Sequence, residues 1–376
     1  MDDEEDFDYD DENSAHYIVL MTCTFVVIAI VGLIGNVLIL LTVLLNASMR
    51  TAPNVLLTNL AVGDLLIIVF WLPNQFSKTI HGHENALSHS SMFMCIASES
   101  CQVISQSVSA LTLTVLSLDR YVVITSTTGR LVSSLLKFYV YVVILIWLLG
   151  ISFAIPIVQF AEYYHLFDVI NTSYLTEEDF EIHADSYICD RMPPSAMSSI
   201  IYESLRVALL YCIPVLIIGT SYSMMARKLI ASLKNVRRLS SRTTSRSQQT
   251  KTRKRLAIAV LVIAIMFALC WLPEMVFNIM RSIDSARVFV LNNNAVQEFG
   301  PLLVYINCCA NPIALGFTSL TFRRHFKRYL LLEFLRGTRI DESGSEYRFV
   351  SQTFRMKHVN KHTGIESMES TEVDKA

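Results

Sequence analysis

Seven long apolar segments recur along this chain, each about twenty residues or longer. They cover residues 17–45, 55–76, 95–121, 138–160, 207–226, 256–273 and 299–322. A helix rises about 1.5 Å per residue, so each segment is long enough to cross the roughly 30 Å hydrocarbon layer of a bilayer. The sequence therefore predicts an all-α membrane protein, a bundle of seven transmembrane helices.

Charged residues are strongly segregated outside these segments. Nine of the first twelve residues are acidic, whereas residues 227–255 contain eleven Lys or Arg and no acid. Only 17% of the whole chain is charged and 52% is hydrophobic, which excludes an ordinary soluble domain. Basic residues beside membrane spans favour the cytoplasmic side. We therefore expect a multi-pass plasma-membrane protein with an extracellular amino terminus.

The third segment carries polar side chains along a helix that has no charge between Gln102 and Leu118. At helical spacing Glu99, Gln102 and Gln106 share one face, and Ser105 and Ser109 share another. Polar groups in hydrocarbon are costly unless they face protein or water. Both faces are therefore expected to point into the bundle.

The two ends of the chain are too polar to bury a core. We expect residues 1–16 to be a disordered extracellular tail, residues 17–335 the helical domain and residues 336–376 a disordered cytoplasmic tail. The acidic tail is either a solvated segment or an electrostatic lure for a basic ligand, with Tyr9 as a sulfation candidate. No basic region precedes the first span, so no cleavable signal peptide is expected.

Two connections have features of their own. Residues 161–196 form the longest outer connection, with Cys189 near its end and a glycosylation sequon at Asn171. The basic inner loop is rich in Ser and Thr, and it either binds anionic lipid, accepts phosphate or touches an acidic partner, or merely sets the topology.

An amphipathic segment follows the seventh span. Its apolar face carries Phe322, Phe326, Tyr329 and Leu330, and bases occupy the opposite face. We expect a short helix in the cytoplasmic membrane interface, in contact with membrane lipid.

Short motifs stand at corresponding places in the segments. The third ends in LSLDRY, which places Asp119, Arg120 and Tyr121 at its inner end; the second contains LAVGD with Asp64, and the sixth contains CWLP. Other marks are Gly35, Asn36, Trp147, Pro214, Tyr222, Phe267, Trp271, Asn307, Asn311 and Pro312. Over about residues 17–335 this set resembles the rhodopsin-like (class A) family of G-protein-coupled receptors.

Within that family the closest resemblance is to short-peptide receptors of the bombesin, endothelin and CCHamide type. It is carried by MRTAPN before the second span, by Gln102, by CWLPE with Arg281, and by NPIAL followed by TFRRHFKRYL. Amine receptors are similar but have an aspartate in place of Gln102. The resemblance implies a secreted peptide as the ligand.

The resemblance also implies how the two ends of the bundle work. Coupling to a heterotrimeric G protein is implied for Asp119, Arg120, Tyr121 and Tyr222, with the Asp-Arg pair intact in the closed bundle. Activation switches are implied at Phe267, Trp271, Asn311 and Pro312. Arrestin and receptor kinases are implied as further partners, whereas no nucleic acid and no enzymatic activity are expected. Cys95 and Cys189, the two cysteines placed at the outer face, are expected to form a disulfide bond.

Charged and amide side chains gather at the outer ends of several spans. They are Glu99, Gln102, Gln106, Glu203, Arg206, Glu274, Asn278, Arg281 and Glu298. They either line a polar ligand cavity or form internal salt bridges that stabilise the bundle. Their mixed charge suits a peptide, which offers both charged groups and amides.

Asp64 is a lone acid in the middle of an apolar span, so its charge must be compensated or neutralised. Packing of the first, second, third and seventh spans would surround it with Asn36, Ser105, Ser109, Asn307 and Asn311. By resemblance this is a site for an allosteric sodium ion; the alternative is a water-filled structural pocket. No other cofactor is expected.

Two positions depart from the family pattern. Leu315 stands where the family has a tyrosine three residues after Pro312, and Arg253 stands where some members have a glutamate that pairs with the arginine of the triplet. Because of Leu315, the inward swing credited to the family tyrosine is not expected in this chain. Because of Arg253, an ion pair between Arg120 and a glutamate of the sixth span cannot form. The alternatives to a signalling receptor are a scavenging peptide or chemokine-like receptor and a transporter, for which no inverted repeat is visible.

Overall fold

The computed structural model describes residues 3–77, 92–125, 136–165, 187–190, 197–236, 244–283, 294–331, 338–340 and 346–348. The chain forms two units, Met1–Lys327 and Arg328–Ala376. The first unit contains the membrane bundle, and the described part of the second consists of short elements.

Within these described residues, seven helices are long and apolar enough to cross a membrane, as predicted. They are His16–Leu45, Ala52–Ser77, Met92–Thr125, Lys137–Phe160, Met197–Lys228, Leu256–Arg281 and Glu298–Thr318. The elements that supply them are α1 (Asp3–Leu45), α2 (Ala52–Leu66) with the π turn η2 (Ile67–Trp71), α4 (Met92–Thr125), α5 (Leu136–Phe160), α7 (Met197–Val207) with the π turn η5 (Ala208–Cys212) and α8 (Ile213–Val236), α9 (Thr244–Arg281), and α11 (Asn294–Thr318). A short 3-10 turn, η1 (Ala47–Met49), joins the first two spans.

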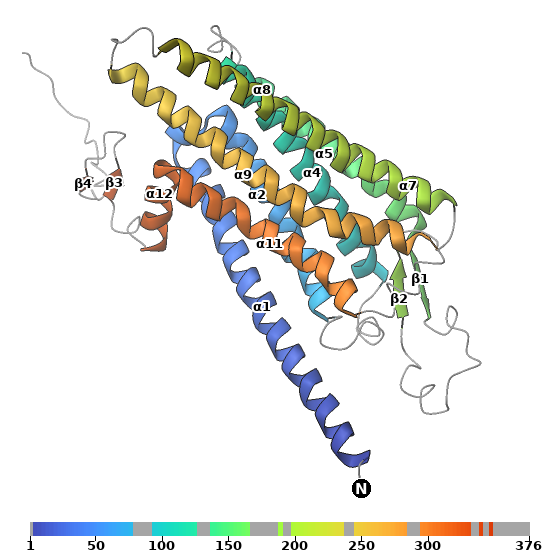
Figure 1. Cartoon of the computed structure of the whole chain (residues 1–376). Helices are drawn as coiled ribbons and strands as arrows, with labels where there is room; N and C mark the ends of the chain where they lie inside the picture. Colours follow the sequence, from blue (N-terminus) through green and yellow to red (C-terminus); the bar gives the residue numbers. More distant parts are fainter. Residues whose placement is uncertain are drawn as a thin grey trace, which may run out of the picture. The chain divides into compact units, whose positions relative to one another are not determined.

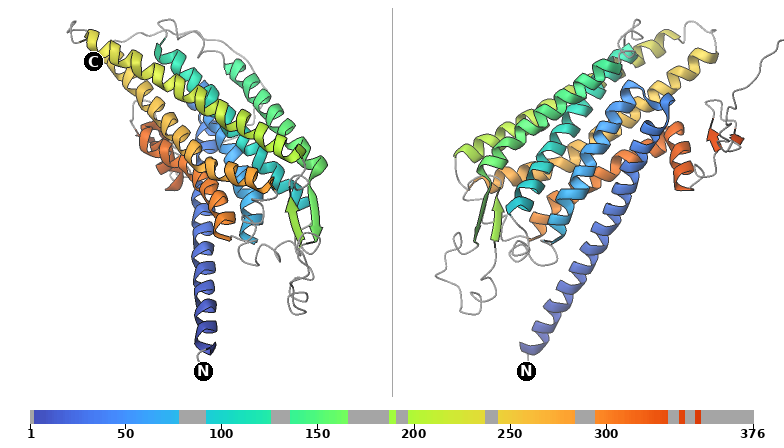
Figure 2. Two further views of the ribbon diagram at one scale, coloured as in Figure 1. Left: turned by 45° about the vertical axis from the view of Figure 1, so that its right-hand side comes forward. Right: turned by 180° about the vertical axis from the view of Figure 1, so that it is seen from behind.

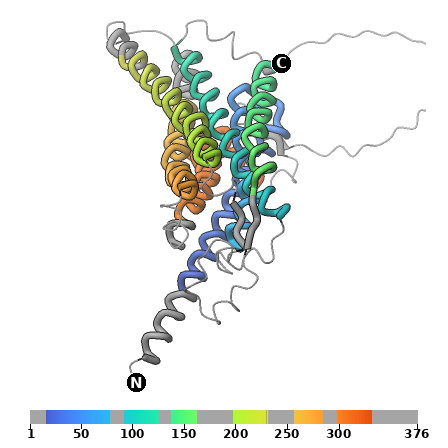
Figure 3. The backbone as a smooth tube through the Cα atoms, turned by 90° about the vertical axis from the view of Figure 1, so that its right-hand side faces the viewer, coloured from blue at the N-terminus to red at the C-terminus, as the bar shows by residue number. Residues whose placement is uncertain are grey.

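Helix α4 lies in the middle of the bundle. It packs against α2, α5, α8 and α9, whereas α11 packs against α9, α1 and α2 (Figure 1). The two views in Figure 2 show the helices side by side, with β1 (Glu162–His165) and β2 (Tyr187–Asp190) at the end of the bundle where α7 begins. Figure 3 shows the bundle turned by 90°, with α8 in yellow-green beside α9 in orange. We name the two ends of the bundle after residues of α4, the Cys95 end and the Arg120 end.

A glycine permits the close contact between the first and seventh spans. A Cβ atom on Gly35 would lie 2.5 Å from Cγ and 2.7 Å from Cβ of Pro312. These distances are too short for any side chain, and a proline ring has little freedom to move away. The contact therefore requires glycine at position 35, one residue before the buried Asn36.

Charged side chains lie inside two helices beyond the predicted limits of the spans. The fifth span begins at Met197 rather than at Val207, and the sixth continues to Arg281 rather than ending at Pro273. The uncharged segments missed these turns because Glu203, Arg206 and Glu274 are charged and yet buried. Glu203 and Arg206 compensate each other within one helix, and amides from α4 complete the compensation of Arg206 and Glu274.

The two terminal segments also differ from the predicted tails. Helix α1 begins at Asp3, within the acidic segment for which no regular structure was expected. Acidic residues near a helix amino terminus are favourable because they face the positive end of the helix dipole. After the bundle, β3 (Thr338–Ile340) pairs with β4 (Glu346–Arg348) as an antiparallel hairpin in the predicted disordered tail. Backbone hydrogen bonds between the two strands give even this polar segment local order.

The seventh span and the amphipathic helix meet at Ser319. Helix α11 ends at Thr318 and α12 (Leu320–Leu330) begins one residue after Ser319, so the seventh span is shorter than the uncharged segment suggested. On α12, Phe322 is buried and its ring lies 5.8 Å from that of Phe326. Leu330, predicted on the same face, is exposed, as an apolar side chain directed at lipid would be.

Candidate functional site

A buried charge cluster lies at the Cys95 end, between α7 and α4. Arg206 is completely buried and donates hydrogen bonds from Nε and Nη2 to Oε2 of Glu203, at 2.9 and 2.5 Å. Its Nη1 donates to Oε1 of Gln106 at 3.2 Å, and Gln106 donates from Nε2 to the sulfur of Met275. The guanidinium is thus compensated by a carboxylate from its own helix and by an amide from α4.

A second polar cluster joins α4 to α9. Oε1 of Glu274 accepts hydrogen bonds from the amides of Gln102, at 2.9 Å, and Asn278, at 3.0 Å. All three side chains are buried. Gln102 and Gln106 are one helical turn apart on α4, so the two clusters form one continuous polar layer from α7 to α9. We call these six side chains, Gln102, Gln106, Glu203, Arg206, Glu274 and Asn278, the polar layer.

Gly300 of α11 lies directly against this layer. A Cβ atom added there would lie 2.6 Å from Oε2 of Glu274 and 3.2 Å from its Cα atom. The lack of a side chain at Gly300 therefore leaves the space that the Glu274 carboxylate occupies. Sequence reasoning missed Gly300, because nothing in its surroundings marks a glycine that faces another helix.

The other predicted ligand-contact residues lie near the same end of the bundle. Glu99 and Glu298 are buried, and Glu298 accepts a hydrogen bond from the hydroxyl of Tyr17 on α1, a partner that the sequence did not suggest. Arg281 is half-buried, and its buried Nε atom has no hydrogen-bond partner among the described residues. A ligand acceptor could satisfy this donor.

The two predicted aromatic switch residues stack inside the bundle. The Phe267 and Trp271 rings are 6.1 Å apart, and Tyr211 of η5 lies 6.4 Å from Phe267. Both switch residues are buried. Trp271 stands three residues before Glu274 on the same helix, so the stack is adjacent to the polar layer.

A further aromatic group, absent from the sequence predictions, lies around Tyr305 of α11. Its ring is 5.1 Å from that of Trp71 and 5.8 Å from that of Phe25. These contacts join the first, second and seventh spans. Such clusters of aromatic rings are ordinary contributors to core packing.

Asp64 lies buried where α2 meets α11. The amide of Asn311 donates a hydrogen bond to Oδ2 of Asp64, and the thiol of Cys308, which donates to the backbone oxygen of Val304 at 3.4 Å, lies near the same carboxylate. Sequence reasoning predicted Asn311 and missed Cys308. Two side chains of the seventh span thus contact a carboxylate of the second.

Other predicted neighbours of Asp64 lie on the helices that pack against α2. Asn36 donates to the backbone oxygens of Gly32, at 2.9 Å, and Cys308, at 3.0 Å, so its amide joins α1 to α11. Four further buried oxygens have no hydrogen-bond partner among the described residues: Oγ of Ser105, Oγ of Ser109, Oδ1 of Asn307 and Oδ1 of Asn311. Unsatisfied buried oxygens from two helices fit either a small cation or bound water.

The Asp119-Arg120 pair at the other end of α4 is intact. Arg120 donates from Nε to Oδ2 of Asp119 at 2.9 Å and also from Nη2 to the same oxygen. The other carboxylate oxygen accepts a hydrogen bond from the hydroxyl of Tyr139 on α5. Within the described residues Arg120 has no salt bridge to α9, in line with the absence of an acid at position 253.

The two predicted tyrosines of this end have contacts to neighbouring helices. Tyr222 of α8 donates from its hydroxyl to the backbone oxygen of Ala257 on α9 at 3.0 Å. Tyr121 lies 5.7 Å below the ammonium group of Lys228. Leu315, in place of the family tyrosine, is fully buried in the core.

The disulfide prediction is tested in part. Cys95 is disulfide-bonded, whereas the six cysteines Cys23, Cys101, Cys212, Cys270, Cys308 and Cys309 are free. Cys189 lies in β2 (Tyr187–Asp190), opposite Tyr163 of β1 (Glu162–His165), but its side chain is outside the described residues. The pairing of the two therefore stays a prediction. Asn171 also lies outside the described residues.

Seven spanning helices, with a polar layer at one end and a paired Asp-Arg at the other, define a seven-helix membrane receptor. The sequence matches the family described as 7 transmembrane receptor (rhodopsin family) over residues 35–314, and the chain belongs to this family. The resemblance drawn from the motifs is confirmed.

Known relatives include several peptide receptors. Bombesin receptor subtype-3 from Ovis aries is 30% identical over 318 residues, which cover 82% of this chain and 73% of the relative. A bombesin receptor from Bombina orientalis is also 30% identical, over 83% of this chain and 76% of its own length. Somatostatin receptor type 4 from Rattus norvegicus is 28% identical, over 88% of this chain and 78% of the relative.

Proposed function

We propose that this chain is a plasma-membrane receptor that binds a secreted peptide at its Cys95 end and activates a heterotrimeric G protein at its Arg120 end. The observation that carries the proposal is the polar layer, which places carboxylates, amides and a guanidinium in the interior of a membrane bundle. Such groups inside a membrane mark functional sites by default. Their mixed charge suits a ligand with both charged groups and amides.

The relatives support a peptide rather than an amine. The named relatives are bombesin and somatostatin receptors. Gln102 occupies the position where an amine receptor has an aspartate, and its amide is already directed at Glu274. The proposed ligand contacts are Glu99, Gln102, Gln106, Arg206, Glu274, Asn278, Arg281 and Glu298. Arg281 offers the clearest donor, because its Nε is buried without a partner among the described residues.

The distribution of basic residues supports the orientation. Arg120 lies at the same end of the bundle as the carboxyl end of α8 and the amino end of α9, and the sequence between and around these two helix ends, residues 227–255, is basic. The positive-inside rule assigns this end to the cytoplasm. The amino terminus and the Cys95 end are then extracellular, where an oxidising environment favours a Cys95–Cys189 disulfide and Asn171 is open to glycosylation. The cytoplasmic tail, with its Ser and Thr among acids, suits receptor kinases and arrestin.

Activation follows from a shift between two arrangements of the helices. In the closed arrangement Asp119 holds Arg120, and Tyr222 is bonded to α9. A ligand that binds an open arrangement more tightly raises its population, and this frees Arg120 and Tyr222 for the G protein. Phe267 and Trp271 lie between the polar layer and this end, and Asn311 and Pro312 lie beside Asp64 and Gly35, so both groups suit the role of switches. The receptor itself catalyses no reaction.

The oxygens near Asp64 fit an allosteric sodium ion. The ion would be held by Asp64, Ser109, Asn307 and Asn311, because hard oxygen ligands suit a small cation. Each of the last three residues carries a buried oxygen that lacks a hydrogen-bond partner among the described residues. The ion would supply the positive charge that a buried carboxylate requires.

A peptide screen tests the proposal. Cells that express the chain are exposed to a library of amidated and unamidated neuropeptides, with calcium and cyclic-AMP responses as readouts. Cells with Arg120→Ala at equal surface level serve as the control, because this variant keeps the ligand site and removes the coupling group. We expect a peptide that binds to the native chain and to the Arg120→Ala variant but produces a calcium or cyclic-AMP response only with the native chain. Internalisation without nucleotide exchange would indicate a scavenging receptor, and ligand flux across the membrane would indicate a transporter.

A further inference from the structure

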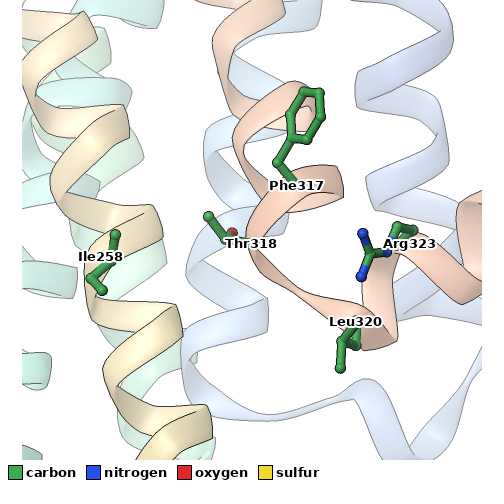
Figure 4. Close-up of a pocket in the computed structure, with 5 residues that line it drawn as sticks. All are labelled: Ile258, Phe317, Thr318, Leu320 and Arg323. Atoms are coloured by element: carbon green, nitrogen blue, oxygen red, sulfur yellow. The ribbon is translucent and has the colours of Figure 1, made fainter.

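A shallow cavity opens at the Arg120 end, where α11 passes into α12. Its volume is about 360 Å³, and it is lined by Ile258, Phe317, Thr318, Leu320 and Arg323. Figure 4 shows Ile258 on α9 at one side of this space and the other four residues around the α11–α12 turn. None of the five belongs to the ligand, switch or coupling residues described above.

Most of the side chains around the cavity are apolar and yet exposed. Phe317 is 79% exposed, Ile258 56% and Leu320 46%. The sixth span begins at Leu256 and the seventh ends at Thr318, so the cavity lies where both spans leave the hydrocarbon layer. At this depth, exposed apolar side chains meet the acyl chains of lipids.

Hydrogen bonds hold the turn that carries Phe317 and Arg323. The N–H of Ser319 donates to the backbone oxygen of Leu315 at 2.9 Å, and the N–H of Arg323 donates to the oxygen of Ser319 at 3.0 Å. Phe322 follows Ser319 by three residues and is buried in the core of the bundle. Arg323 directly follows this anchor, so its backbone has a defined position at the rim of the cavity.

We propose that this cavity binds an anionic phospholipid of the cytoplasmic leaflet. One acyl chain packs against Ile258 and Phe317, and the anionic headgroup lies at Arg323. Charge complementarity supports this occupant, because the exposed base Arg323 lines the cavity beside its apolar walls and α12 carries no acid. The apolar walls exclude a free soluble anion as the preferred occupant.

A lipid in this position has a consequence for the bundle. It contacts α9 through Ile258 and the α11–α12 turn through Phe317 and Arg323 at the same time. It therefore favours the spacing of these helices that the structure shows over any arrangement that separates them. The proposal depends on the cytoplasmic assignment of the Arg120 end, but not on the identity of the extracellular ligand.

Photo-crosslinking in nanodiscs tests the proposal. The purified full chain is placed in nanodiscs that contain phosphatidylserine with a diazirine on one acyl chain, and labelled peptides are mapped by mass spectrometry. We expect labelling on the peptides that contain Ile258 and Phe317, and weak labelling by the matching phosphatidylcholine probe. Arg323→Gln should reduce the phosphatidylserine labelling about fivefold, the effect of losing about one direct hydrogen bond to the headgroup.

Two variants make the result specific. Arg324→Gln removes the same charge from the adjacent residue, which does not line the cavity, and should leave labelling near the native level. Phe317→Ser keeps every charge and removes an exposed apolar wall, so it should also reduce labelling without disturbing the core. Equal labelling by both lipid probes, equal loss with Arg323→Gln and Arg324→Gln, or absence of label from both cavity peptides would overturn the proposal. Thermal unfolding midpoints confirm that each variant is folded.

Discussion

Tyr139 of α5 donates a hydrogen bond to the carboxylate oxygen of Asp119 that Arg120 does not use. The carboxylate is therefore held from two sides, by a guanidinium on its own helix and by a phenol on the next span. No acid from α9 reinforces the pair within the described residues. Tyr139 is thus the tertiary contact that positions Asp119.

Replacing Tyr139 by Phe should raise basal signalling. The change removes one hydrogen bond to a buried carboxylate, and a loss of about 1 kcal/mol from the closed arrangement would increase the open population about fivefold. Ligand-independent GTPγS binding to membranes with equal receptor levels measures the effect. Tyr141→Phe on the same helix is the matched control, because Tyr141 is exposed and should have no effect. Equal basal exchange in both variants would contradict the role of Tyr139.

Replacing Gly300 by Ala should weaken ligand binding. The new Cβ atom would lie 2.6 Å from Oε2 of Glu274, so the carboxylate must move and its bonds to Gln102 and Asn278 are disturbed. We expect a loss of affinity of roughly tenfold, the effect of about one hydrogen bond to a charged group. Gly219→Ala is the matched control, since a Cβ atom at Gly219 has nothing within 4 Å. Competition binding with the cognate peptide measures the affinity of both variants. Unchanged affinity in Gly300→Ala would place the ligand away from Glu274.

Replacing Cys95 by Ser should strongly impair ligand binding, and so should Cys189→Ser. If the two cysteines share one bond, the double variant should be hardly worse than either single one, because each change already removes that bond. Ligand binding at equal surface level measures the three variants. Additive losses, or a free thiol at Cys189 in the native protein, would refute the pairing. Cys23→Ser is the control, since Cys23 is free and exposed.

Sodium should lower agonist affinity in the native protein. An ion held by Asp64 favours the arrangement that encloses it, so by linkage a ligand that favours another arrangement must bind less tightly when sodium is present. Asp64→Asn should remove this dependence because it deletes the charge and nearly preserves the shape. Agonist binding in sodium and in choline at constant ionic strength measures the effect. Affinity that is insensitive to sodium in the native chain would leave Asp64 as a structural acid with bound water.

Much of the architecture is readable from the sequence because membrane burial is a local property of each segment. Seven spans follow from apolar runs of sufficient length, and the inward face of α4 follows from the spacing of Gln102 and Gln106. The sequence also pointed to Asp64 with Asn311 and to Asp119 with Arg120. In these cases the motif already contains the residues that meet, or the family pattern names them.

Only the tertiary structure decided which side chains meet across helices. Glu274 is 172 positions from its partner Gln102, and Tyr139 stands 20 positions after Asp119. Buried charges such as Arg206 made the predicted spans too short, because hydropathy treats every charged side chain as unfavourable in a membrane and takes no account of its partners. Gly35 and Gly300 are defined by the atoms opposite them, Pro312 and Glu274. Such contacts depend on the packing of whole helices, so the order of residues along one segment does not contain them.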